Sequence, residues 1–230
     1  MSDFPFGHPG SMAWSGGGFI STCPMNITRS LSDSILFYTC LMGIMFFMMK
    51  MLPTAKAGGW SSICRLKEYA PFSFTTEETG GIIGNGDITM DWIVHVLKRT
   101  VDTQYRTKAD RRHTFLAGSS MGGLMTLYGL LAYPEVFSRG AALSPSLWID
   151  AEKVKTMIRH ARVKRNTVLY MDYGALEFAD HPHSRSLFAE VSALLIEKRV
   201  LLNSRIVPRG THCEASWEKQ IPFFMKTLFE

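Results

Sequence analysis

Ser120 is the residue best placed to do chemistry, because it lies in the run Gly118-Ser119-Ser120-Met121-Gly122. A short apolar, β-prone segment (114–117) precedes this run, and leucines recur at helical spacing over 124–133 after it. A serine held on a tight turn between a strand and a helix presents its hydroxyl as a nucleophile, which an ordinary surface serine does not. The sequence therefore predicts a nucleophilic serine at position 120.

His212 is the expected base for this serine. A serine nucleophile needs a base that takes its proton, and the base needs a carboxylate that fixes its tautomer. Of the seven histidines, His212 follows a strand-like segment (201–207) and precedes a helix-like tail, whereas His95 lies within a helical pattern and His113 opens a strand. We therefore expect the loop that carries His212 to face Ser120.

Three carboxylates compete for the role of the acid. They follow the strand-like segment 167–172: Asp172 is still close to the strand, Glu177 lies in the turn after Gly174, and Asp180 lies further out. Loop carboxylates are usually solvated charges without a special role. We expect Glu177 to be the acid, with Asp180 as the alternative.

The segments around these residues alternate between strand-like and helix-like patterns. A helix is expected over 87–101, where the apolar residues fall on one face, and further helices over 151–160 and from residue 187. Such alternation predicts an α/β fold with a mostly parallel sheet and helices on both faces. A chain of 230 residues, 46% of them hydrophobic, is expected to bury one good core.

From about residue 65 to the C-terminus, several segments together resemble the putative-esterase group of α/β-hydrolases, which includes esterase D, enterochelin-type siderophore esterases, feruloyl esterases and mycolyltransferases. The segments that carry the resemblance are 68–71, 105–107, 117–124, 133–137, 143–148 and 210–214. The resemblance implies an α/β-hydrolase that cleaves esters, or transfers acyl groups, without a metal or an organic cofactor. The family's Gly-x-x-Asp or Gly-x-x-Glu turn matches 174–177, which supports Glu177 as the acid.

The resemblance also implies roles for individual residues. Ser120, His212 and Glu177 would form a Ser-His-Glu triad that works through an acyl-enzyme, and the Met121 backbone N–H would stabilise the oxyanion. Ser144 and Trp148 would line the substrate pocket, although a core role for Trp148 is an equal alternative.

Composition limits the partners. The net charge is +5 and the pI about 9.1, but the basic clusters at 98–112 and 159–165 have no interleaved aromatics or nucleic-acid motif, so we expect solvated surface and no nucleic-acid partner.

The four cysteines show no metal-type spacing or compact disulfide framework, which favours a reducing, cytoplasmic compartment. The spacing of His181 and His183 relative to His212 is too loose for a metal site. The expected partner is a small-molecule ester, and the sequence leaves its class and the oligomeric state open.

The first quarter, residues 1–64, is atypical and is assigned as a leader. Residues 35–49 carry no charge, but a membrane-spanning helix needs about 20 apolar residues, so a membrane partner is not expected. The family's first core strand and its second oxyanion donor are not recognisable here. An adjacent reading frame can encode, over 35–59, a strand followed by the family's Asp-Gly-x-Asn loop. Our hypothesis is that 1–64 is a frameshifted or truncated start of the hydrolase domain and that 65–230 is the esterase domain.

Two alternatives to an active esterase follow from this leader. The first is a catalytically impaired family member, since a missing oxyanion donor costs ~10² to 10³ in turnover. The second is a membrane-anchored binding protein that uses residues 35–49 as its anchor.

Overall fold

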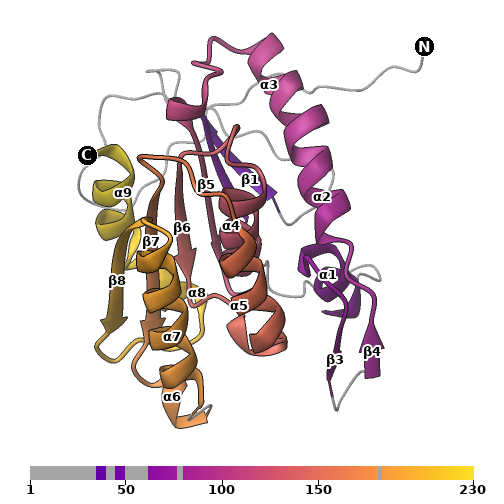
Figure 1. The fold of residues 1–230 in the computed structure, drawn as a ribbon. Helices are drawn as coiled ribbons and strands as arrows, with labels where there is room; N and C mark the ends of the chain where they lie inside the picture. The colour runs from indigo at the N-terminus through magenta and orange to yellow at the C-terminus, as the bar shows by residue number, and fades with distance from the viewer. Residues whose placement is uncertain (1–34, 40–44, 50–61, 77–79, 181–182) are drawn as a thin grey trace.

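The computed structural model describes residues 35–39, 45–49, 62–76, 80–180 and 183–230 (Figure 1). At its centre is a six-stranded sheet with the order β1-β2-β5-β6-β7-β8. Strand β1 is antiparallel to β2, and the pairs β2–β5, β5–β6, β6–β7 and β7–β8 are all parallel. The strands are β1 Ile35–Thr39, β2 Met45–Met49, β5 Thr114–Ser119, β6 Arg139–Leu143, β7 Val168–Gly174 and β8 Leu201–Val207.

Helices connect the successive strands β5, β6, β7 and β8 of this sheet. A small two-stranded sheet of β3 (Phe74–Thr76) and β4 (Gly80–Ile82) lies apart from the central one (Figure 1). The helical segments are α1 Ser62–Tyr69, α2 Gly86–Trp92, the π-helix η1 Ile93–Leu97, α3 Lys98–Gln104, the 3₁₀-helices η2 Arg111–His113 and η3 Leu147–Ile149, α4 Met121–Ala132, α5 Ala151–His160, α6 Glu177–Asp180, α7 His183–Glu197, α8 Glu214–Glu218 and α9 Ile221–Phe229. The helix predicted over 87–101 corresponds to α2, η1 and α3, which follow one another without a break.

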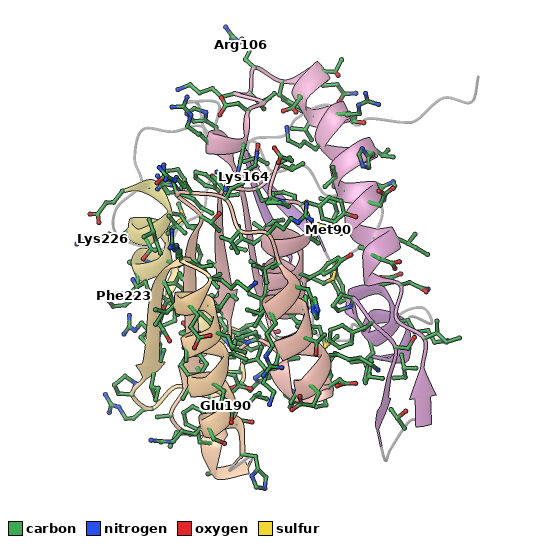
Figure 2. The ribbon with its side chains drawn as sticks, in the orientation of Figure 1. Met90, Arg106, Lys164, Glu190, Phe223 and Lys226 are labelled. Carbon is green, nitrogen blue, oxygen red and sulfur yellow. The ribbon has the colours of Figure 1, made fainter. Side chains whose placement is uncertain are left out.

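Side chains of the central strands alternate between two hydrophobic clusters, one on each face of the sheet. Leu116 of β5 belongs to the cluster under α2, α4, α5 and α7, whereas its neighbours Phe115 and Ala117 belong to the cluster under α8 and α9. Met90 of α2 is fully buried and lies between α2 and α4 in Figure 2. Because both faces are covered, β5 is buried along its whole length, as expected for a central parallel strand. The predicted α/β fold with a mostly parallel sheet is confirmed.

Most residues of the basic clusters noted in the sequence are exposed, but Lys98 is buried, and its amine donates to Asp102 (2.6 Å) and to the Ala109 carbonyl (2.8 Å). Arg106, in the loop after α3, and Lys164, in the loop before β7, are exposed, and Arg106 points away from the core at the top of Figure 2. Most of these charges are therefore exposed to solvent, and Lys164 is also ion-paired with Glu135.

The first quarter contains strands that the sequence analysis did not recognise. Residues 35–39 and 45–49 form β1 and β2, and β2 pairs with β5 from Met45–Thr114 to Met49–Gly118. Their aromatic and β-branched residues suit strands. The other leader residues, 1–34, 40–44 and 50–61, lie outside the described residues, and so does much of the segment in which the second oxyanion donor was sought. In the described part of the chain, no helix is both long and apolar enough to cross a bilayer, and the described parts of the anchor hypothesised at 35–49 are strands.

Candidate active site

Ser120 occupies the turn between β5 and α4 in a strained conformation. Its φ is 56° and its ψ is −122°, a region that costs residues other than glycine on the order of 1–3 kcal/mol. The Ser120 N–H donates to the carbonyl of Leu143 (2.9 Å), and the Ser120 carbonyl accepts from the N–H groups of Leu124 and Ser146 (both 3.1 Å). The turn is thus held from both α4 and the segment after β6, and the predicted strand-turn-helix is present.

The three residues expected to act together are joined by hydrogen bonds. The Ser120 Oγ lies 2.9 Å from His212 Nε2, and His212 Nδ1 lies 2.7 Å from Glu177 Oε2. They follow β5, β8 and β7 respectively, and the carboxyl ends of parallel strands share one edge of a sheet, which is why residues so distant in sequence meet. Ser120 and Glu177 are buried, whereas the His212 side chain is 42% exposed. The site is therefore open to solvent on the side of the imidazole.

The environment of Glu177 favours its ionised form. Its Oε1 accepts hydrogen bonds from the Gly174 N–H (2.8 Å) and the Ser144 hydroxyl (2.7 Å), and its Oε2 faces His212. Burial by itself raises the pKa of this carboxyl, but the hydrogen bonds from His212, Ser144 and Gly174 outweigh it and hold the pKa below its usual value. Glu177 can therefore hold the imidazole in one tautomer and stabilise an imidazolium.

The two competing carboxylates have other surroundings. Asp172 is 1% exposed, and its oxygens accept from the Tyr170 hydroxyl (2.8 Å) and the Ser144 N–H (3.2 Å) rather than from His212. Burial raises the pKa of Asp172 to about 6. Asp180, the alternative acid, is the last residue of α6, and its side chain lies outside the described residues.

Ser144 is buried beside Glu177. It was expected in the substrate pocket, but it is 1% exposed, and its hydroxyl lies between Glu177 and the indole of Trp217, which donates to it (3.0 Å). Trp217 also meets the His212 ring edge-on, with the ring centroids 5.0 Å apart. The sequence predicted only a helix-like tail after His212, and Trp217 lies in its first helix, α8. Its position five residues after His212 was the available signal.

Three further residues border Ser120 or the loop after β6. Ser146 was not predicted: it is buried, and its hydroxyl lies 3.3 Å from the Ser120 hydroxyl. Met121 is the first residue of α4, where N–H groups have no acceptor within the helix and the helix dipole favours negative charge. Trp148 lies in η3 and is 47% exposed, which excludes the core role considered for it.

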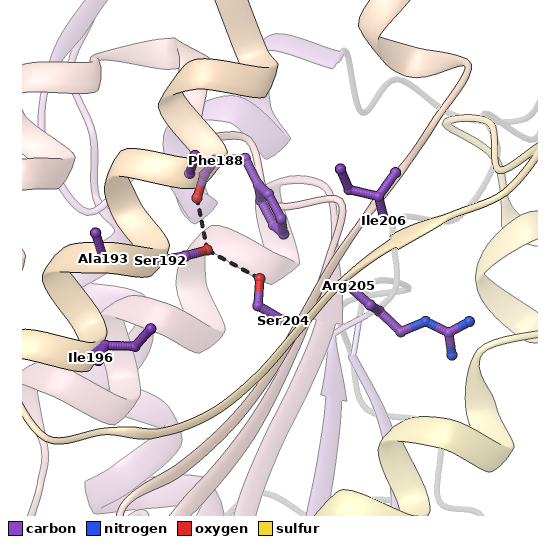
Figure 3. A pocket seen from close by; sticks show the side chains of 8 residues that line it. Phe188, Ser192, Ala193, Ile196, Ser204, Arg205 and Ile206 are labelled. Atoms are coloured by element: carbon purple, nitrogen blue, oxygen red, sulfur yellow. Dashed lines mark hydrogen bonds between the residues drawn. The ribbon is translucent and has the colours of Figure 1, made fainter.

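A separate pocket lies beside β8. It has a volume of about 570 Å³ between α7 and β8 and is shown in Figure 3. Its polar lining includes Ser192 and Ser204, whose hydroxyls are hydrogen-bonded (3.1 Å), and Arg205. Ser120, Glu177 and His212 are not among its lining residues, so this pocket is distinct from the hydrogen-bonded cluster.

Within the described ranges, no group of three or more His, Cys, Asp or Glu side chains could hold a metal ion, and His181 lies outside those ranges.

Comparisons with solved structures agree on the fold. The BES protein from Bacillus cereus is similar over 95% of this chain and 99% of its own, with 12% identity and a TM-score of 0.60. An IroE-like serine hydrolase from Shewanella oneidensis is similar over 71% of this chain and 55% of its own (20% identity, TM-score 0.58), and the siderophore hydrolase EstA from Aspergillus nidulans over 73% and 67% (20% identity, TM-score 0.56). This chain thus spans little more than half the length of the Shewanella protein.

Sequence comparison gives the family. No curated protein matches the chain significantly. Residues 84–224, more than half of the chain, match the family described as "Putative esterase", and this range includes Ser120, Glu177 and His212. The segments that carried the resemblance from 105 onwards lie in the same range. The chain therefore belongs to the putative esterase family of α/β-hydrolases.

Proposed function

We propose that this protein is a serine carboxylesterase that acts on a small-molecule ester, with Ser120 as nucleophile, His212 as base and Glu177 as acid. The observation that carries the proposal is the hydrogen-bonded series from the Ser120 hydroxyl through both nitrogens of His212 to the Glu177 carboxylate. Membership of the esterase family and the strained turn at Ser120 support it. No organic cofactor or metal takes part in the proposed reaction.

The reaction follows from the chemistry of these groups. His212 Nε2 accepts the Ser120 proton while the serine oxygen attacks the ester carbonyl, and Glu177 Oε2 stabilises the imidazolium that forms. The negative charge on the tetrahedral intermediate faces the N-terminus of α4, where the Met121 N–H is the proposed donor. Collapse of the intermediate gives an acyl-enzyme and releases the alcohol, to which His212 returns the proton. Water, deprotonated by His212, then releases the carboxylic acid.

The proposal extends to the boundaries and location expected from the sequence. The esterase domain is proposed to span 65–230, with β1 and β2 of the atypical leader adding to its sheet. The cysteine pattern supports a cytoplasmic location. Trp148, exposed in η3 after the loop that carries Ser146, is proposed to contact the substrate.

Hydrolysis of a short-chain nitrophenyl ester by the purified full chain tests the function. We expect turnover by the wild type and a loss of about 10³-fold or more in kcat for Ser120→Ala, because the nucleophile is removed. Ser204→Ala, an exposed serine on β8, is the matched control and is expected to keep full activity. A folded wild type without hydrolysis would instead favour the catalytically impaired family member.

A further inference from the structure

Ser144 connects the proposed acid to the segment that follows the proposed base. Its hydroxyl lies 2.7 Å from Glu177 Oε1 and 3.0 Å from Trp217 Nε1. Ser144 comes directly after β6, Glu177 begins α6, and Trp217 lies in α8, so one buried oxygen ties together three separate elements. Neither the proposed reaction nor the family resemblance uses this contact.

The chemistry of the three groups fixes the direction of both hydrogen bonds. An indole N–H can only donate, so the Ser144 oxygen is the acceptor from Trp217. The single hydroxyl proton of Ser144 is then directed to Glu177 Oε1, which also accepts from the Gly174 N–H. With Oε1 occupied by two donors, Oε2 is the oxygen left for the Nδ1–H of His212. His212 Nε2 therefore carries the lone pair that faces Ser120.

Ser144 is itself held independently of Ser120 and His212. Its φ is 41°, which few side-chain-bearing residues adopt without support, and its N–H donates to both the carbonyl oxygen (3.0 Å) and the Oδ1 (3.2 Å) of Asp172. The other oxygen of Asp172 accepts from the Tyr170 hydroxyl (2.8 Å). The position of the Ser144 hydroxyl is thus fixed by β6 and β7, the strands beneath the site.

Trp217 extends the same constraint to the imidazole. It is 8% exposed, and its ring meets that of His212 at 85°, with the centroids 5.0 Å apart. The indole N–H is bonded to Ser144, which holds Glu177, and the indole ring contacts His212. Movement of His212 relative to Glu177 would therefore break either the contact of Trp217 with His212 or its hydrogen bond to Ser144.

We propose that Ser144 is a positioning residue that orients Glu177 for His212, and that Trp217 fixes the direction of the Ser144 hydrogen bond while supporting the imidazole. This inference rests on the proposed function, since it assigns how the proposed acid and base are held. Ser144 itself touches neither substrate nor the reacting atoms in this assignment.

The test uses two variants of the full chain that remove single hydrogen bonds. Ser144→Gly deletes the hydroxyl and tolerates the positive φ, and Trp217→Phe keeps an aromatic ring beside His212 but deletes the donor. We expect kcat for the nitrophenyl ester to fall by about 10²-fold in Ser144→Gly, with KM nearly unchanged, because a misplaced acid and base slow the chemical step. Trp217→Phe should lower kcat by a smaller factor. The two variants remove parts of the same hydrogen-bonded series, so kcat of the double variant should be close to that of Ser144→Gly alone, and not reduced by the product of the two single losses.

Ser138→Ala is the matched control. Ser138 is buried like Ser144, but its hydroxyl has no hydrogen-bond partner among the described residues, so its removal should leave kcat, KM and the spectrum below unchanged. A loss of activity in this control equal to that of Ser144→Gly would mean that any buried serine deletion has the same effect, and the positioning role would be wrong.

Proton NMR supplies a readout that does not need turnover. The Nδ1–H of a histidine bonded to a carboxylate resonates far downfield, and we expect this signal in the wild type, a shift or loss in Ser144→Gly and no change in Ser138→Ala. Unchanged kcat and an unchanged resonance in Ser144→Gly would overturn the inference even where Ser120→Ala supports the esterase. Should Ser144→Gly fail to fold by circular dichroism, the same two readouts on Trp217→Phe decide. An inactive wild type would contradict the proposed function, while the resonance would still test how Glu177 and His212 are held.

Discussion

Two carboxylates in one buried cluster, Glu177 and Asp172, differ in how firmly they hold a proton. Both are desolvated, which favours the neutral acid. Glu177 faces three donors, including His212, and its pKa lies below the usual value, whereas Asp172 faces the Tyr170 hydroxyl and the Ser144 N–H, and burial raises its pKa to about 6. Both carboxylates are therefore ionised at neutral pH, and Asp172 is the one that takes up a proton in mild acid.

Asp172→Asn should change how stability depends on pH. The folded pKa of about 6 lies above the unfolded value of roughly 3.9, so the folded state binds this proton more tightly, and the resulting stability is full below pH ~3.9 and lost as the pH rises through about 6. Asparagine can still accept from the Ser144 N–H and is not ionised. Between pH 4 and 7 we expect the wild type to lose on the order of 3 kcal/mol of unfolding free energy relative to the variant. Urea unfolding at a series of pH values measures this, and a difference that stays constant with pH would contradict it.

Single residues were predictable only where a local pattern pointed to them. Ser120, His212 and Glu177 each lie in a loop just after a strand, and their order along the chain made them candidates. The contacts of Ser144 left no such signal, because its partners Glu177 and Trp217 are 33 and 73 positions away in the sequence. Its burial behind the acid depends on how β6, β7 and α8 come together, which no local pattern in the sequence shows.

The crossing of β5 and α4 depends on the absence of a side chain at Gly118. A Cβ on Gly118 would lie 2.4 Å from both the backbone carbon and the oxygen of Gly122, so the strand and the helix could not keep their present separation. The turn that carries Ser120 lies between Gly118 and Gly122. Any widening of the crossing therefore moves the proposed nucleophile relative to His212.

Gly118→Ala should destabilise the fold and reduce activity together. The clash is with backbone, which cannot rotate away, and we expect a loss of more than about 2 kcal/mol in the free energy of unfolding. Gly81→Ala is the control, since a Cβ on that β4 glycine has no heavy atom within 4 Å, and its effect should stay within about 0.5 kcal/mol. Urea unfolding compares them, and equal midpoints for the two variants would show that the crossing adapts.

Elements with a clear period were predicted well, and those without one were not. The apolar face over 87–101 gave the helix that α2, η1 and α3 form, and the alternation of segments gave the parallel sheet. In β2 the five residues Met45–Met49 are all apolar, and a strand of continuous apolar residues has no alternation that would separate it from a buried helix. Its pairing with β5 depends on a partner that lies nearly 70 residues further along the chain.

At the scale of the whole molecule, β2 covers the edge of β5 that would otherwise be open. β5 is buried at all six of its positions and carries the turn of Ser120 at its end. A domain that began at residue 65 would lack β1 and β2, and an apolar central strand would become an exposed edge, a typical site of aggregation.

Removing residues 1–64 should therefore abolish the soluble, folded state. The full chain and the 65–230 fragment can be compared by solubility, circular dichroism and hydrolysis of the nitrophenyl ester. If the fragment were soluble, cooperatively folded and as active as the full chain, β1 and β2 would be dispensable and 65–230 would be a self-sufficient esterase domain.

The opposite edge of the sheet holds the proposed base. β8 is exposed or half-buried along its length, and in the described part of the chain it pairs with β7 on one side only. The solvent-open pocket of Figure 3 lies between β8 and α7. Such a margin opens more readily than the centre of a sheet. When heat or denaturant first loosens this edge of the sheet, we expect the His212 side chain to move away from Ser120 and Glu177, while the turn at Ser120, at the centre of the sheet, keeps its conformation. Activity would then be lost before the protein unfolds, and for a time the protein would be structured but inactive.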